Sequence, residues 1–228
     1  MIFNDVQLLN SGKHSDAKLE ENVFLMKYWE NIRDLFLIYL PDNFDFLGMK
    51  KLKVKLGPFE GDAFIPAGED GIATFKIQNF TYEFFYELSE EEKNEKSLSY
   101  IEEALTKICD QFKLPSDIKE TVKKTAQLVR ENSFEHFRTH SKTSKWHKSR
   151  KLRAVTELHF KKGGINATLI ITNKSGDIII KQNIFESKFW ESAWFDLWKG
   201  YWIDNKFKIE NRTGKVYFET RSFDEIAI

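Results

Sequence analysis

The segment LRAVTELHFKKGGINATLIIT, from Leu152 to Thr172, decides the fold of the second half of this chain. Apolar and polar residues alternate from Leu152 to Phe160, as in a strand with one buried face. Gly163-Gly164 favours a turn, and Ile165 to Thr172 follows as a second strand. Because so short a turn joins antiparallel neighbours, the segment predicts an antiparallel hairpin.

Downstream of this hairpin, the sequence predicts three more strands and one short helix. The strands are expected at Ile178 to Phe185, Trp202 to Ile209 and Lys215 to Thr220, and the helix at Ser187 to Lys199. Tryptophan recurs every four residues from Trp190 to Trp202, so an apolar arc wider than one core-facing stripe is expected on this helix. The turn Asn211 to Gly214 indicates that the last two strands pair as a hairpin.

Upstream, the predicted order is a helix, a set of strands and two amphipathic helices. The helices are expected at Ser15 or Asp16 to Leu40, Ser89 to Leu114, and Ser116 to about Phe137, and the strands at Lys51 to Leu56, Phe59 to Ile65, Ile72 to Phe80, and Tyr82 to Tyr86. The first of the paired helices begins with the capping box Ser89-Glu90-Glu91-Glu92. The expected fold is α+β, with antiparallel β-meanders packed against an N-terminal helix, a central helical hairpin and a short Trp-rich helix.

Composition places the chain among globular proteins with a sizeable core. Hydrophobic residues make up 41% and aromatic residues 15% of the 228 positions. The single cysteine, Cys109, excludes an internal disulfide and is expected in the core. The start, MIFNDVQLLNSGKH, lacks the features of a signal peptide, and no run of residues is apolar enough to span a membrane. We therefore expect a cytoplasmic protein that contacts no membrane and uses no cofactor.

The zero net charge hides an asymmetry between the two halves. Residues 1–114 carry 21 acidic and 13 basic residues, and residues 115–228 carry 14 acidic and 22 basic residues. These net charges of −8 and +8 suggest an acidic half, 1–114, and a basic half, 115–228, either as two domains or within one continuous domain.

The most basic stretch is RTHSKTSKWHKSRKLR, from Arg138 to Arg153. It contains seven lysines or arginines and no acidic residue. As a phosphate-contacting arm it would use a tryptophan and six cations: Arg138, Lys142, Lys145, Trp146, Lys148, Arg150 and Lys151. Two other interpretations stay open: a polar connector between a helix and a strand, or a segment that pairs with the acidic half.

A second candidate surface combines acidic and aromatic residues. The acidic hairpin carries Glu60, Asp62, Glu69 and Asp70, and no basic residue lies between Lys55 and Lys76. Such a patch suits a basic protein partner, and Trp194 and Trp198 are residue types that dominate protein interfaces. The alternatives are a solvated hairpin and a buried helix.

Two residue pairs are weak candidates for chemistry. Glu157 and His159 lie two apart on the same face of a predicted strand, as general acid–base catalysis would need. His136 and His140 lie four apart, and on a helix they would share a face and be able to hold a metal. The ordinary interpretations are an exposed strand surface and a polar helix end.

No catalytic or cofactor motif accompanies these features. We therefore expect a non-catalytic protein that binds another macromolecule, most concretely an inhibitor of the immunity-protein type that neutralises a protein partner through the acidic and aromatic surface. The alternative is a nucleic-acid-binding protein or nuclease that uses residues 138–153.

Overall fold

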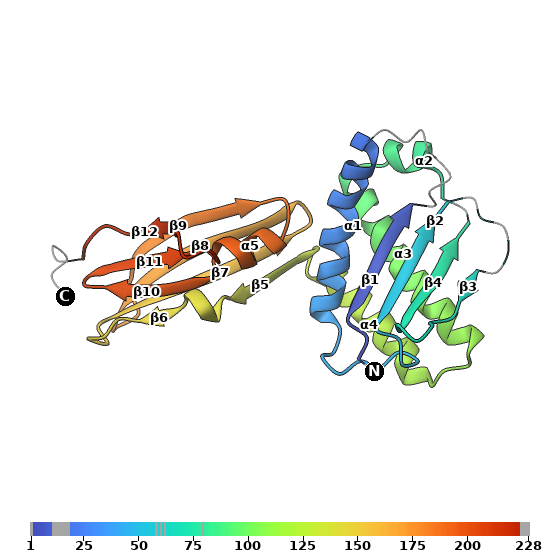
Figure 1. Cartoon of the computed structure of the whole chain (residues 1–228), viewed down its shortest axis with the longest axis horizontal. Coiled ribbons are helices and arrows are strands. Elements are labelled where there is room, and N and C mark those ends of the chain that lie inside the picture. The colour runs from blue at the N-terminus through green and yellow to red at the C-terminus, as the bar shows by residue number, and fades with distance from the viewer. Residues whose placement is uncertain are drawn as a thin grey trace. The chain divides into compact units, whose positions relative to one another are not determined.

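The computed structural model describes residues 2–10, 19–57, 59, 61, 63–78 and 80–223. The chain forms two compact units, Met1–Phe134 (unit 1) and Glu135–Ile228 (unit 2), and both are visible in Figure 1. By sequence, unit 1 carries 24 acidic and 17 basic residues, and unit 2 carries 11 acidic and 18 basic residues. The net charges are therefore −7 and +7. The expected division after residue 114 falls between the two helices of the helical hairpin.

The described residues of unit 1 form a four-stranded sheet and four helices. In chain order they are β1 (Asp5–Asn10), α1 (Leu19–Tyr39), β2 (Lys51–Leu56), β3 (Phe64–Ile65), β4 (Ile72–Ile77), α2 (Tyr82–Glu87), α3 (Glu90–Gln111) and α4 (Ser116–Glu131). The strand order is β1-β2-β4-β3, and α3 lies behind the sheet in Figure 1. Of the described helices in either unit, none is both long and apolar enough to cross a membrane.

The sheet of unit 1 is mixed, which differs from the antiparallel neighbours predicted for this half. β2 pairs in parallel with both β1 and β4, and only β3 is antiparallel, to β4. Helix α1 supplies the long connection that a parallel β1–β2 pair needs. The strand β1 was not predicted, whereas the predicted β3–β4 hairpin is present in a shorter form.

The alternation KLKVKL of β2 places Leu52, Val54 and Leu56 in the core and its three lysines at half-buried positions. Helix α3 begins with the predicted capping box, in which Ser89 and Glu92 exchange hydrogen bonds. Cys109 is buried as expected, and burial raises the pKa of its thiol. The segment Tyr82–Glu87 is a helix and not the predicted strand.

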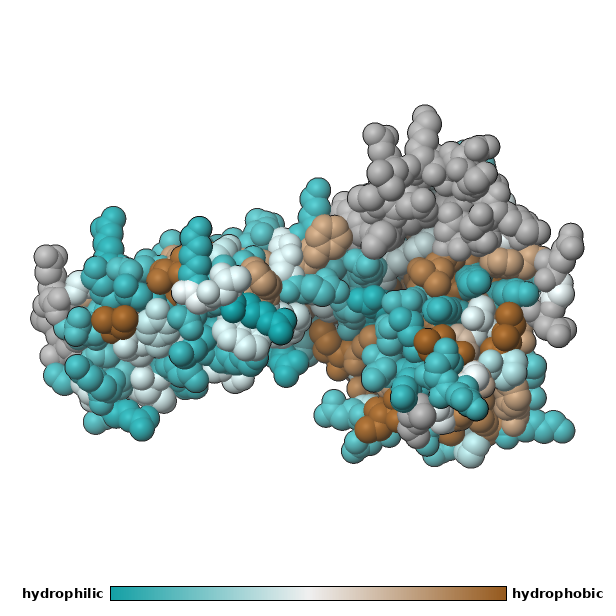
Figure 2. All heavy atoms as spheres, in the orientation of Figure 1, coloured by the Kyte–Doolittle hydropathy of each residue, from teal (hydrophilic) through white to brown (hydrophobic). Residues whose placement is uncertain are grey.

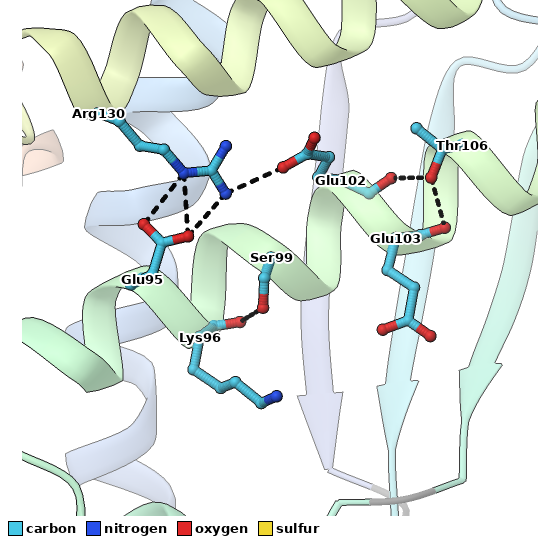
Figure 3. A network of polar contacts seen from close by, with 7 residues as sticks. All are labelled: Glu95, Lys96, Ser99, Glu102, Glu103, Thr106 and Arg130. Atoms are coloured by element: carbon cyan, nitrogen blue, oxygen red, sulfur yellow. Dashed lines mark hydrogen bonds and ion pairs between the residues drawn. The ribbon is translucent and has the colours of Figure 1, made fainter.

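Helices α3 and α4 form the predicted hairpin and are joined by an ion-pair cluster (Figure 3). The Arg130 guanidinium of α4 donates hydrogen bonds to both carboxylate oxygens of Glu95 on α3, at 2.7 to 3.1 Å. Its Nη2 also lies 2.9 Å from a carboxylate oxygen of Glu102. These carboxylates raise the pKa of Arg130 despite its partial burial.

Unit 2 contains two antiparallel sheets and one short α-helix. In chain order its elements are β5 (Glu135–Thr139), the 3-10 helix η1 (Ser141–Thr143), β6 (Lys145–Trp146), β7 (Leu152–Lys161), β8 (Gly164–Asn173), β9 (Ile178–Ser187), α5 (Glu191–Asp196), β10 (Lys199–Ile203), β11 (Lys206–Glu210) and β12 (Val216–Glu219). The larger sheet has the order β5-β7-β8-β9, with β6 also paired to β7, and the smaller sheet is β10-β11-β12. The antiparallel meander predicted for this half is thereby confirmed.

The core of unit 2 lies between the two sheets. Inward residues of β7 and β8, such as Leu158 and Leu169, are fully buried, as are Phe207 and Ile209 of β11. The smaller sheet and α5 lie over one face of the larger sheet in Figure 1. The Trp-rich helix is shorter than predicted, because β9 extends to Ser187 and β10 already begins at Lys199.

Candidate polyanion-binding surface

The basic stretch 138–153 is folded against β7 and is not a loose connector. It comprises the end of β5, then η1, β6 and the start of β7. His140, Thr143 and His147 are buried, whereas all seven cations are exposed. The exposed cations are Arg138, Lys142, Lys145, Lys148, Arg150, Lys151 and Arg153.

The inward residues hold this stretch in place by hydrogen bonds. The His140 backbone N–H donates to the Thr156 carbonyl at 2.8 Å, and the Thr156 hydroxyl donates to the Thr143 carbonyl at 3.2 Å. Farther along, His147 Nε2 lies 2.9 Å from the Asp204 carbonyl oxygen in the β10–β11 turn. The stretch is thus anchored to β7 at His140 and Thr143, and to the β10–β11 turn by the His147 side chain.

A close approach of backbones brings η1 next to β10. A Cβ atom at Gly200 of β10 would lie 2.8 Å from both Thr143 Cα and Phe207 Cζ, so only glycine fits without displacement. Lys142 precedes Thr143, and Trp198 precedes β10 by one residue. The contact at Gly200 therefore places Lys142 beside Trp198.

Cations contact two tryptophan rings in this region, Trp198 and Trp146. Lys142 Nζ lies 3.7 Å, and Arg212 Cζ 5.5 Å, from the centroid of the Trp198 ring. Arg153 Cζ lies 5.5 Å from the centroid of the Trp146 ring on the neighbouring strand β6. These distances are in the range of cation–π contacts. Trp146 and Trp194 are each 42% exposed, and Trp198 is 36% exposed, so all three rings remain accessible.

The cations of the stretch lack acidic neighbours, unlike several other lysines of unit 2. Among the residues that the structure describes, no carboxylate oxygen lies within 4.0 Å of any of the seven. By contrast, Lys199 pairs with Glu210, and both Lys206 and Lys208 pair with Glu219. The face of unit 2 turned toward the viewer in Figure 2 is largely hydrophilic, with isolated apolar residues. Within the described part of the chain, the positive charge of 138–153 is therefore not neutralised by ion pairs.

His140 lies beneath this surface. Its side-chain Nδ1 lies 2.8 Å from the Thr143 hydroxyl, and its ring centroid lies 5.2 Å from that of Trp194. Burial, with smaller contributions from the nearby Lys142 and Arg138, lowers the pKa of His140 to about 4. His140 is consequently neutral at physiological pH and packs as part of the core.

The helical arrangement expected for His136 and His140 is wrong. α4 ends at Glu131, and His136 lies on strand β5, with His140 directly after that strand. Burial, with a contribution from Arg138, lowers the pKa of His136. In the described parts of the chain, no group of three or more His, Cys, Asp or Glu side chains is positioned to hold a metal ion.

Glu157 and His159 lie on the face of β7 turned away from the core, as predicted. His159 Nε2 bonds to Glu135 of β5 at 2.9 Å, and its ring stacks on Phe137 at a centroid distance of 4.1 Å. Glu157 is exposed opposite Thr168 and Thr139. The carboxylate that contacts His159 is thus that of Glu135, which the sequence did not single out.

The six residues expected to bind a protein partner divide between the units. Glu60 and Asp62 lie outside the described residues. Glu69 and Asp70 are exposed in the turn before β4, where a carboxylate oxygen of Asp70 accepts a hydrogen bond from the Ile72 N–H. Trp194 and Trp198 belong to unit 2, and Trp198 lies beside Lys142 and Arg212.

Arg212 is the residue of the surface that the sequence did not reveal. It lies in the predicted turn between β11 and β12, and its N–H donates to the Phe195 carbonyl at 2.8 Å. This bond fixes the turn to the end of α5 and explains why Arg212 reaches Trp198. Its contact with Trp198 depends on strand pairing, which local sequence does not encode.

Comparison with known proteins assigns no role to these residues. No protein-family model, no curated protein and no solved structure matches this chain. The function must therefore be argued from the charges, rings and contacts of the surface itself.

Proposed function

We propose that unit 2 binds single-stranded nucleic acid through residues 138–153 together with Trp194, Trp198 and Arg212. The observation that carries this proposal is the position of Trp198 beside both Lys142 and Arg212. An accessible ring next to two cations offers a stacking platform for a base and charge for the adjoining phosphates.

The cations support the phosphate part of the proposal. Seven exposed lysines and arginines follow one another along a folded segment without acidic neighbours among the described residues. Neutralising phosphates with such residues releases counterions, which provides most of the non-specific affinity for nucleic acid. The anchoring of His140 and His147 reduces the conformational entropy that the segment would lose on binding.

The exposed rings favour a single strand over a duplex. Trp146, Trp194 and Trp198 offer partly accessible indole faces, and unstacked bases bind such faces. A base in a duplex is already stacked and is not free to do so. The elements that carry these rings are short strands, a short helix and turns, and the described residues of unit 2 include no long helix that could enter a major groove.

The competing proposal is a protein inhibitor that binds through acidic residues. It would use Glu69 and Asp70 in unit 1, and it leaves the unpaired cations of unit 2 without a role. The two proposals make opposite predictions for variants of the basic stretch, so one binding experiment separates them.

The test is fluorescence anisotropy of a labelled single-stranded oligonucleotide with the full chain, at about 50 mM and about 200 mM salt. The variant Lys145→Ala/Lys148→Ala/Lys151→Ala should bind more weakly. The slope of its log affinity against log salt concentration should become less steep by about 2, since each lost phosphate contact removes about 0.7. The corresponding duplex should bind more weakly than the single strand.

The matched control is Lys123→Ala/Lys124→Ala/Lys181→Ala, which removes the same charge from exposed positions on α4 and β9. Its affinity and salt slope should stay close to those of the wild-type chain. Equal losses in both triple variants, or no binding of oligonucleotide by the wild type, would refute the proposal. If the wild-type chain instead binds a protein, and that binding survives nuclease treatment and depends on Glu69 and Asp70, the inhibitor proposal is supported.

A further inference from the structure

Unit 1 contains a cleft of about 320 Å³ between strand β4 and helix α3. From the sheet side it is lined by Ala63 and residues 75–78, and the Lys76 N–H donates to the Ala63 carbonyl at 2.7 Å. The polar side chains around it are Lys76, Gln78, Lys96, Tyr100, Glu103 and Lys107. This volume is at the lower end of the range for sites that bind small molecules.

Helix α3 presents one face to this cleft. Lys96, Tyr100, Glu103 and Lys107 follow the helical repeat, so they form a stripe along α3. Figure 3 shows Lys96 and Glu103 pointing away from Arg130, on the side of α3 opposite the contact with α4. The stripe is therefore separate from the ion-pair cluster that joins the two helices.

Lys96 is the cation of the cleft with the least compensation. Its ammonium nitrogen lies 5.3 Å from the centroid of the Tyr100 ring, and within the described ranges no carboxylate oxygen comes within 4.0 Å of it. Lys107, in contrast, lies 2.6 Å from the Glu103 carboxylate. In a unit whose net charge is −7, an uncompensated and half-buried lysine indicates a local preference for an anion.

The strand side of the cleft adds a hydrogen-bond donor. Lys76 Nζ lies 5.7 Å from the centroid of the Phe59 ring, and the Gln78 side-chain amide donates to the Phe59 carbonyl at 3.3 Å. On the α3 side, burial and the nearby Glu103 raise the pKa of Tyr100 to about 12, so its hydroxyl keeps its proton. Lys96 thus supplies a cation, and Gln78 and Tyr100 supply N–H and O–H donors around the cleft.

The position in the fold agrees with a ligand site. The cleft includes Ile77 and Gln78, at the carboxyl end of β4, and β4 is parallel to β2 and β1. In sheets with parallel strands, ligands bind beyond the carboxyl ends of those strands. Lysine ammonium groups are suited to phosphate as compact charges that each donate several hydrogen bonds.

We propose that this cleft binds a small organic phosphate, with Lys96 contacting the phosphate. The cleft is larger than a phosphate group alone requires, which leaves room for an organic moiety beside Tyr100. This site is in unit 1 and is independent of the nucleic-acid surface proposed for unit 2.

Isothermal titration calorimetry of the full chain with inorganic pyrophosphate tests the proposal. Wild-type protein should bind pyrophosphate, and both Lys96→Ala and Lys96→Gln should weaken binding about tenfold or more, as expected for one lost charged hydrogen bond. Lys123→Ala/Lys124→Ala, which alters exposed lysines of α4, should leave the affinity unchanged. Citrate, an anion built from carboxylates, should bind more weakly than pyrophosphate.

Three results would overturn the proposal: no binding of pyrophosphate, unchanged binding by the Lys96 variants, or citrate binding as tight as that of pyrophosphate. A Lys142→Ala/Arg212→Ala variant separates the two sites, because it alters only unit 2. It should weaken oligonucleotide binding and retain pyrophosphate binding. Loss of pyrophosphate binding in that variant would assign the anion to unit 2 and reject the cleft.

Discussion

Lys142 Nζ lies 3.7 Å from the centroid of the Trp198 ring, the shortest of the cation–π distances between described residues. Lys142 belongs to η1, and Trp198 lies between α5 and β10, so the contact joins segments that are distant in sequence. The hydrogen-bonded turn that carries Arg212 brings a second cation to the same ring. Three separate segments thus converge on one partly exposed indole.

Replacing Trp198 should weaken binding of single-stranded nucleic acid without unfolding unit 2. We expect Trp198→Ala to lose about 1–3 kcal/mol of binding free energy, the range for a base stacked on an aromatic side chain. Trp198→Phe, which keeps a flat ring, should lose less. Fluorescence anisotropy measures the affinity, and circular dichroism checks the fold. Unchanged affinity in a folded Trp198→Ala protein would show that this ring does not contact the ligand.

The Arg130 cluster should contribute modestly to the stability of unit 1. Arg130→Ala removes hydrogen bonds to Glu95 and Glu102, but the side chains of Arg130 and Glu95 are 33% and 47% exposed. Solvent screening therefore limits the expected loss to about 1 kcal/mol of unfolding free energy. Lys107→Ala, at a more exposed pair, should cost about 0.3 kcal/mol. Urea denaturation measures the loss of unfolding free energy in each variant. Equal losses would contradict the larger contribution expected of Arg130, which contacts two carboxylates.

A side chain at Gly200 should lower the stability of unit 2. A Cβ atom there would lie 2.8 Å from Phe207 Cζ and Thr143 Cα, so Gly200→Ala must displace a buried ring or the η1 backbone. Overpacking of this kind costs about 1–3 kcal/mol. Gly163→Ala is the control, since a Cβ atom there meets nothing within 4 Å, and its effect should stay below about 1 kcal/mol. Denaturant unfolding curves of the two variants compare these costs directly.

Elements with a local signal were predicted well from the sequence. The alternation of β2, β7 and β8, the capping box of α3 and the turn before β12 all have their cause within a few residues. The exposure of the cations in 138–153 was likewise predicted, because a run of such residues cannot be buried without partners.

Elements set by tertiary contacts were missed. The aromatic segment Tyr82–Glu87 has a high strand propensity, yet it is helical and packs Phe85 against Trp29 and Phe80. After α4, Ser133 and Phe134 adopt φ values of 55° and 59°, a left-handed conformation that favours glycine. Because no glycine marks the end of α4, the sequence predicts a helix that continues into β5. The convergence of three segments on Trp198 depends on tertiary contacts, which the local sequence does not indicate.

Protonation of His140 should couple acidity to the stability of unit 2. Its pKa is about 4 in the folded protein, chiefly because of burial, and about 6.5 in the unfolded chain. Between these values the unfolded chain binds more protons, so the unfolding free energy falls as the pH decreases from about 6.5 to about 4. The complete loss for this group is about 3 kcal/mol.

The variant His140→Gln isolates this contribution. It removes the titrating group, so its unfolding free energy should depend less steeply on pH than that of the wild type between pH 6.5 and 4. Carboxylates titrate equally in both proteins, and the difference between the two curves therefore reports His140. Urea denaturation at several pH values provides these curves. Parallel curves would mean that His140 is protonated equally in the folded and unfolded states, contrary to its burial beside Thr143 and Trp194.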